Sequence, residues 1–220
     1  MKVIALAQQK GGVAKSTLAI NLAVAAHRGG VPTVIIELDR QGTSSTWAAA
    51  RAEAGLGKPD VMQLAAHQLE QTLRVIQGLG VKLAILDLPG AHNPAINAAI
   101  KAADLVLLPS RPQETDVQAS AEPLAVVQRL RKAYAYVMTF VEPSAPARAK
   151  DAARDLTEAG HRVVPQFIFR RQEYVDAVVA GKGTPEIKSA AKAAGEVAGL
   201  LKWITKELDH EHREGRAQSA

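Results

Sequence analysis

Short apolar runs alternate with stretches of helical pattern along the 220 residues of the chain, and this alternation limits the possible folds. The runs are rich in Val, Ile and Leu and mostly lack period-two alternation, which is typical of strands buried on both faces. We predict strands at residues 3–7, 33–38, 82–88, 105–109, 134–141 and 163–169. We predict helices at residues 15–28, 60–77, 93–102, 114–132, 146–159, 171–180 and 185–208. This order favours an α/β fold, with a doubly wound, mostly parallel sheet and helices on both faces.

The chain shows no internal repeat and no linker, so we expect residues 1–208 to form a single domain. The remaining residues, 209–220, are polar and are expected to form a flexible tail. There is no cysteine, which excludes disulfides, thiolate metal sites and cysteine nucleophiles. No apolar segment approaches the roughly 20 residues of a membrane span, and the N-terminal residues do not resemble a secretory signal. We therefore expect a cytoplasmic protein.

The segment that follows the first predicted strand resembles a phosphate-binding loop. Ligands of such sheets bind at the C-terminal ends of the strands, where this segment lies. Compared with the pattern G-x-x-x-x-G-K-[ST], it keeps Lys15 and Ser16 but has Gln9 and Ala14 in place of the two glycines. Successive backbone N–H groups can still attract phosphate. Ala14 is harmless there if its φ is negative and costly if its φ is positive.

As a nucleotide site, this loop would use seven consecutive residues: Gly11, Gly12, Val13, Ala14, Lys15, Ser16 and Thr17. Lys15 would contact the β- and γ-phosphates, the Ser16 hydroxyl would coordinate Mg²⁺, and Thr17 would lie near the α-phosphate. The alternative is a Gly-rich turn that merely connects a strand to a helix.

Two further acidic residues follow predicted strands. Asp39 comes after the strand at 33–38, and Asp87 ends the apolar run LAILD. A carboxylate at such a position can orient an attacking water or hold Mg²⁺. For Asp39 the alternative is a residue that caps the next helix, with Ser44, Ser45 or Thr46 as another candidate cap.

The pattern K-G-G-x-x-K-[ST]-[ST] at residues 10–17 resembles the deviant Walker A box of the ParA/MinD ATPases. The resemblance covers nearly the whole chain and is looser beyond residue 90. It implies ATP and Mg²⁺ as cofactors and a homodimer in which Lys10 reaches the ATP of the partner subunit. Lys10, Lys15 and Asp39 would be catalytic, with Asp39 positioning the attacking water, and Asp87 would hold Mg²⁺ together with Ser16.

The same resemblance implies two switch segments, one with Gln41 and Gly42 and one with Pro89 and Gly90. The chain departs from the family pattern at Ala14, at Glu37 and at Arg40. A nucleotide-binding module with little turnover therefore stays open as an alternative.

Within this family the chain resembles a small ParA-type protein without an N-terminal helix-turn-helix domain. The absence of cysteine excludes the iron proteins, and the polar C-terminal residues argue against a MinD-like membrane helix. The resemblance then implies non-specific DNA binding by the ATP dimer, release through hydrolysis stimulated by a ParB-like partner, and association with the bacterial nucleoid. A MinD-like membrane-associated ATPase and a metabolic P-loop enzyme are the competing readings.

The candidate DNA contacts are basic residues of the C-terminal region: Lys188, Lys192, Lys202 and Lys206, extended by Arg170 and Arg171. On a helix of residues 185–208 the four lysines would lie on one face, opposite an apolar face. Such phosphate contacts would be independent of sequence and sensitive to salt. The alternative is an ordinary solvated helix face.

Overall fold

The protein is described by a computed structural model covering residues 1–90 and 94–217, with side chains to His210 at the C-terminal end. Its centre is a parallel sheet of strand order β3-β2-β4-β1-β5-β6. The strands are β1 (Lys2–Leu6), β2 (Thr33–Glu37), β3 (Asp60–Gln63), β4 (Leu83–Asp87), β5 (Leu105–Ser110) and β6 (Ala133–Met138). β2, β4 and β5 are buried at every position, as strands covered on both faces must be.

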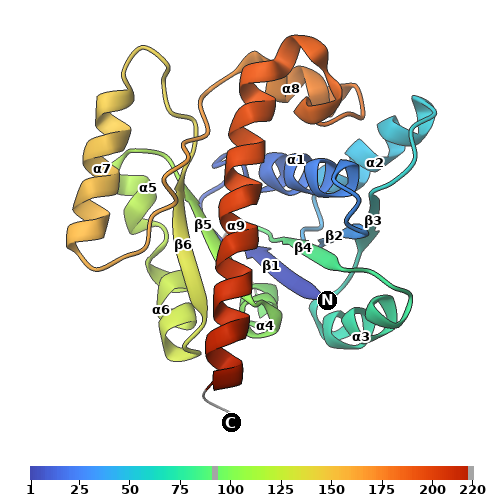
Figure 1. Ribbon diagram of the computed structural model, residues 1–220, viewed down its shortest axis with the longest axis horizontal. Helices are drawn as coiled ribbons and strands as arrows, with labels where there is room; N and C mark the ends of the chain where they lie inside the picture. Colours follow the sequence, from blue (N-terminus) through green and yellow to red (C-terminus); the bar gives the residue numbers. More distant parts are fainter. Residues whose placement is uncertain (91–93, 218–220) are drawn as a thin grey trace.

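Helices cover both faces of this sheet (Figure 1). One face carries α3 (Leu69–Gly78), α4 (Pro94–Ala102), α6 (Ala121–Arg129) and α7 (Pro146–Glu158). The other carries α1 (Lys15–Arg28), α2 (Thr43–Glu53), α8 (Gln172–Val179) and α9 (Ala191–Ala217). The short helix α5 (Glu114–Gln118) follows β5, and short 3-10 helices are η1 (Ala66–Gln68), η2 (Thr184–Glu186) and η3 (Lys188–Ala190). The predicted doubly wound α/β fold is confirmed.

Several elements differ from the sequence prediction. The predicted helix at 114–132 is divided into α5 and α6. The predicted helix at 60–77 begins instead with the edge strand β3, whose side chains are all partly or fully exposed. The predicted strand at 163–169 pairs with β6 and its extension only at its two ends, through Val163 and Phe169. Pro165 lies between these ends and has no N–H to give to a ladder. Helix α2 was not among the predicted helices, although Ser44, Ser45 and Thr46 were considered as caps of a helix that follows Asp39.

The C-terminal helix also has different bounds from those predicted. α9 begins at Ala191, after two turns of 3-10 helix, and continues to Ala217 rather than ending near residue 208. The predicted tail at 209–220 lies partly outside the described residues. Within the described part of the chain, no helix is both long enough and apolar enough to cross a membrane.

A buried clasp joins α2 to the segment that precedes α9. Arg51 donates to both carboxylate oxygens of Glu186, at 2.9 and 2.8 Å, and to the carbonyl oxygen of Gly181 at 3.0 Å. The indole N–H of Trp47 donates to the carbonyl oxygen of Lys182. Added side-chain atoms at Gly181 would collide with the backbone of Arg51, so this position requires glycine. The clasp holds α2, which follows the loop after β2, against the C-terminal part of the chain.

Candidate nucleotide-binding site

The loop between β1 and α1 folds as a phosphate-binding loop despite its two missing glycines. Gly12 and Ala14 both adopt left-handed backbone conformations, with φ of 70° and 72°. Thr139 donates to the carbonyl oxygen of Val13 at 3.2 Å, which fixes the middle of the loop from β6. Ala14 precedes the first residue of α1, so the loop leads directly into a helix N-terminus. Such an end attracts phosphate through its free N–H groups.

The loop opens onto a cavity of about 510 Å³ at the C-terminal edge of the sheet. The three segments singled out from the sequence meet there. The lining residues are Gln9, Gly11, Gly12, Ala14, Lys15, Ser16, Thr17, Asp39, Gln41, Thr43, Pro89, Gly90 and Phe140. This juxtaposition is what parallel strands predict, because their carboxyl ends meet at one edge.

Lys15 is buried, and its ammonium lies 3.4 Å from the carbonyl oxygen of Lys10. Burial lowers its pKa, while the charges of Asp87 and Asp39 act in the opposite direction. A buried cation that lines this cavity is well placed to bind an anionic phosphate.

Asp87 is a buried carboxylate beside this lysine. Burial raises its pKa to about 6, against the lowering effect of hydrogen bonds from Ser16 and Ser44, and nearby Glu37 also raises it. The Ser44 hydroxyl donates to its Oδ2 at 2.7 Å, whereas its Oδ1 has no hydrogen-bond partner. An unpartnered buried carboxylate oxygen next to a serine hydroxyl is the hard oxygen donor set that Mg²⁺ uses. The predicted pair of Ser16 and Asp87 therefore fits a bound Mg²⁺.

The helix cap proposed as an alternative role for Asp39 belongs to another residue. Glu37, at the end of β2, accepts hydrogen bonds from the backbone N–H groups of Ser44 and Ser45 at the start of α2. Asp39 instead accepts the N–H of Gln41 at 3.0 Å and lines the cavity. The glutamate at position 37 thus has a structural role, and Asp39 is left facing the nucleotide site.

The segments with Gln41 and Gly42 and with Pro89 and Gly90 border the cavity from two sides. An added side-chain atom at Gly90 would lie 3.0 Å from the carbonyl oxygen of Gln9, so the two loops approach closely. Gly42 is in a left-handed conformation just before α2. These positions suit segments that respond to a γ-phosphate, which stays a prediction.

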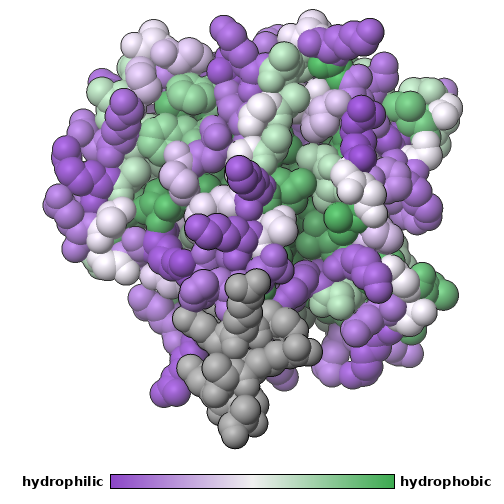
Figure 2. All heavy atoms as spheres, in the orientation of Figure 1, coloured by the Kyte–Doolittle hydropathy of each residue, from purple (hydrophilic) through white to green (hydrophobic). Residues whose placement is uncertain are grey.

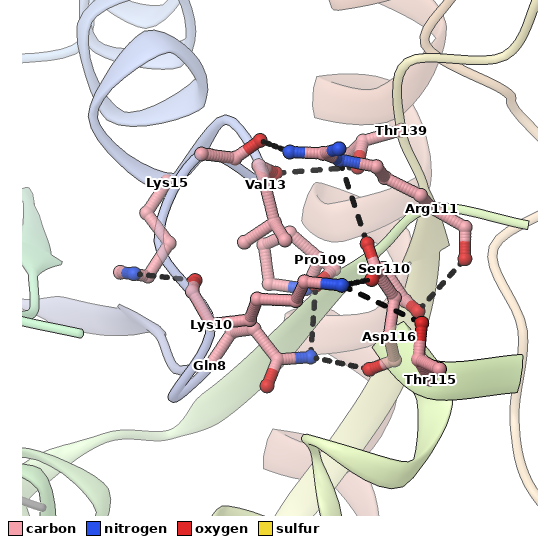
Figure 3. A network of polar contacts seen from close by, with 11 residues as sticks. Gln8, Lys10, Val13, Lys15, Pro109, Ser110, Arg111, Thr115, Asp116 and Thr139 are labelled. Carbon is pink, nitrogen blue, oxygen red and sulfur yellow. Dashed lines mark hydrogen bonds and ion pairs between the residues drawn. The ribbon is translucent and has the colours of Figure 1, made fainter. Parts of the chain in front are cut away.

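Lys10 points away from the cavity, toward α5 (Figure 3). Its ammonium pairs with the carboxylate of Asp116, which is fully buried, and lies 3.5 Å from the Thr115 hydroxyl. Arg111 donates to the carbonyl oxygen of Gly12 at 2.6 Å, and its Nε lies 3.4 Å from Asp116 Oδ2.

Sequence reasoning missed Arg111, Asp116, Thr139 and Phe140. A signal for them existed, since all four follow the C-terminal ends of β5 and β6, where ligands of such sheets bind.

The candidate DNA contacts divide into two groups. Lys192, Lys202 and Lys206 lie on α9 and are exposed, and they fall within about 80° on the helix wheel. Lys188 is exposed but belongs to η3, so the continuous four-lysine helix face was wrong.

The two arginines are already engaged in ion pairs. Arg170 pairs with Glu142 at 3.1 Å and Arg171 with the buried Glu196 at 2.6 Å. Arg171 therefore holds the fold together, and only the exposed Arg170 retains surface that a phosphate could reach.

Comparisons with known proteins identify the family of this chain. Residues 4–184 match the CobQ/CobB/MinD/ParA nucleotide binding domain. The chain is 30% identical over 214 residues to a maintenance of carboxysome distribution protein A from Gloeobacter kilaueensis, covering 96% of both chains. It is 27% identical over 198 residues to a protein ParA from Rhizobium radiobacter, covering 86% of this chain and 87% of that one.

Among solved structures, a chain of the MinC:MinD cell division protein complex from Aquifex aeolicus matches with a TM-score of 0.77. It covers 94% of this chain and 96% of that chain at 14% identity, a likeness of fold. The family match spans the loop, both acidic segments and most of the sheet. The protein therefore belongs to the CobQ/CobB/MinD/ParA nucleotide-binding family and is an ATPase of the ParA/MinD type.

Proposed function

We propose that this positioning ATPase works as an ATP-dependent dimer that binds DNA without sequence preference. Hydrolysis, stimulated by a ParB-like or other adaptor protein, would release it. The observation that carries the proposal is the divergence of two lysines on one loop. Lys15 is buried beside the nucleotide cavity, whereas Lys10 points away from this cavity and keeps 38% of its side chain exposed. A single nucleotide site needs one such cation, and a second lysine directed away from that site suits a nucleotide held by another subunit.

The residues of the cavity have distinct tasks in this proposal. Lys15 and the loop N–H groups bind the phosphates, and Ser16 and Asp87 would hold Mg²⁺, which supplies charge neutralisation when bound. Asp39 orients the attacking water. In phosphoryl transfer such positioning and charge stabilisation are the main contributions a protein makes.

DNA is proposed as the surface on which the dimer travels. The exposed lysines of α9 lie outside the nucleotide cavity and could contact phosphates without reading bases. The name of one relative, a maintenance of carboxysome distribution protein, points to the positioning of a cargo. In a bacterial cell the ATP form would then associate with the nucleoid. The cargo could be a plasmid, a chromosome or a protein assembly.

Sedimentation of the purified protein tests the proposal. We expect monomer with ADP, dimer with a non-hydrolysable ATP analogue, and co-sedimentation with plasmid DNA only in the second case. Lys15→Ala should lose nucleotide binding. Lys10→Ala should bind ATP as a monomer, and Asp39→Ala should bind ATP but remain a dimer because turnover stops. A wild-type protein that stays monomeric with the analogue would contradict the proposal.

A nucleotide-binding module with little turnover is the second candidate, and the positive φ of Ala14 favours it. Release of phosphate from ATP, measured with and without DNA, distinguishes the two. A MinD-like membrane association would instead appear as ATP-dependent pelleting with anionic liposomes.

A further inference from the structure

Asp116 occupies an unusual position for a carboxylate. Its side chain has no exposed surface. Its Oδ1 forms an ion pair with the ammonium of Lys10, and its Oδ2 lies 3.4 Å from Nε of Arg111. Removal of a partner from a buried charge is costly, because the charge left behind has neither water nor a cation. The fold therefore gives Asp116 a strong hold on Lys10.

The neighbouring contacts fix this carboxylate in place. Gln8, at the end of β1, is buried and donates to the backbone carbonyl oxygen of Asp116 at 3.1 Å and to that of Pro109 at 3.3 Å. The first residues after β1 and the helix after β5 are thus tied together beneath the loop (Figure 3). Asp116 cannot easily follow Lys10 if that lysine moves outward.

We propose that Asp116 is a positioning residue that seats Lys10 against its own subunit and so sets the threshold for ATP-dependent dimerisation. The inference rests on the proposed function, in which Lys10 acts on the nucleotide of the partner. To do so, Lys10 must leave Asp116. The phosphates of the partner's ATP then compete with the Asp116 carboxylate for the Lys10 ammonium. In a subunit without an ATP-bound partner, Lys10 stays paired with Asp116.

Arg111 makes this exchange feasible. Its guanidinium donates to Gly12, lies over the ring of Phe140 at 5.5 Å, and places Nε within 3.4 Å of Asp116 Oδ2 without a hydrogen bond. A small movement of Arg111 would let it pair fully with Asp116 when Lys10 departs. Because Arg111 also donates to the carbonyl oxygen of Gly12, this movement would change the position of the nucleotide loop.

Chemical labelling of lysines tests the Lys10–Asp116 ion pair in the nucleotide-free monomer. With a limiting amount of acetic anhydride and mass spectrometry, Lys10 of the wild type should react several times more slowly than the exposed Lys202 and Lys206. Asp116→Asn keeps the shape and removes the charge, so Lys10 should then react faster while the α9 lysines do not change. Glu114→Gln, on the exposed side of the same helix, is the matched control and should leave Lys10 slow.

Dimerisation tests the consequence. With a non-hydrolysable ATP analogue, Asp116→Asn should dimerise at roughly three- to tenfold lower protein concentration than the wild type, the range expected for loss of one partly exposed ion pair. Glu114→Gln should match the wild type. An unchanged or weaker dimer, or unchanged labelling of Lys10, overturns the proposal.

The two measurements separate the possible failures. A wild type that never dimerises contradicts the proposed function, while the labelling still measures whether Lys10 is paired with Asp116. If Asp116→Asn does not fold, the wild-type labelling decides alone, and a Lys10 that reacts as fast as Lys206 overturns the inference.

Discussion

Ala14 adopts a left-handed backbone conformation that an alanine accepts only at a cost. The sequence could predict the loop, because Lys15 and Ser16 keep their places, but it could not give the sign of φ at Ala14. That sign depends on contacts from elsewhere in the chain, such as the bond from Thr139 to Val13. The same holds for Asp87 and Lys10, whose partners Ser44 and Asp116 are far away in the sequence.

Ala14→Gly should stabilise the nucleotide-free protein by roughly 1 kcal/mol, since glycine adopts this conformation without steric strain. The free energy of unfolding in urea measures the effect. Ala25→Gly, in the helical part of α1, is the matched control and should destabilise by about 1 kcal/mol. A strong rise in ATPase activity of Ala14→Gly would show that the alanine also restrains turnover, and equal destabilisation by both changes would contradict the strain.

Asp87 should make the stability of the nucleotide-free protein depend on pH. Its pKa rises from 3.8 to about 6 on folding, so the folded state binds the proton more tightly than the unfolded state. The free energy of unfolding should therefore fall as the pH rises through this window and level off above about 6, for a total loss of about 3 kcal/mol.

Asp87→Asn removes this contribution, and comparison with the wild type isolates it. The variant should be more stable than the wild type at pH 8 without Mg²⁺ and nearly equal at low pH. With ATP present, added Mg²⁺ should raise the melting temperature of the wild type but not that of the variant. An identical pH dependence of the two proteins would rule out a raised pKa at Asp87.

At the scale of elements, the strands with continuous apolar runs could be predicted, including β6 at one edge of the sheet, whereas the edge strand β3 could not. β2, β4 and β5 lie among the predicted runs because each is a continuous apolar segment. β3 has partly exposed residues on the edge of the sheet, so it carries no such signal. The apolar residues at 163–169 cover the other edge without forming a strand, because Pro165 interrupts the pairing.

The clasp between α2 and the segment before α9 should contribute strongly to stability. Arg51→Ala leaves the mostly buried Glu186 without its cation and should destabilise by roughly 3–5 kcal/mol in urea unfolding. Arg74→Ala breaks an exposed pair with Glu70 and should cost about 0.5 kcal/mol or less. Equal effects of the two substitutions would mean that the clasp is not a significant tie.

At the scale of the whole molecule, the nucleotide cavity and the proposed DNA surface are separate. The cavity is built at the C-terminal edge of the sheet, and α9 crosses one face with its exposed lysines (Figure 1). On this face hydrophilic and hydrophobic residues are interspersed (Figure 2). A modest, salt-sensitive affinity for DNA is therefore expected.

The double substitution Lys202→Glu and Lys206→Glu should weaken binding of the ATP form to plasmid DNA at low salt. It should also flatten the dependence of log affinity on log salt by about two for each subunit. A fluorescence titration at several salt concentrations measures both. Lys101→Glu with Lys150→Glu, which alters exposed lysines of α4 and α7 by the same charge, is the control; equal losses from both pairs would leave only a general charge effect.

The strand order has a consequence for folding of the chain during its synthesis on the ribosome. β1 is made first, yet it lies between β4 and β5, so both of its neighbours are complete only after residue 110 has been translated. At ordinary rates of synthesis this interval is on the order of 5 to 20 seconds. During that time the apolar β1 lacks at least one of its two neighbouring strands, and the nascent chain is a natural client for chaperones until the centre of the sheet can form.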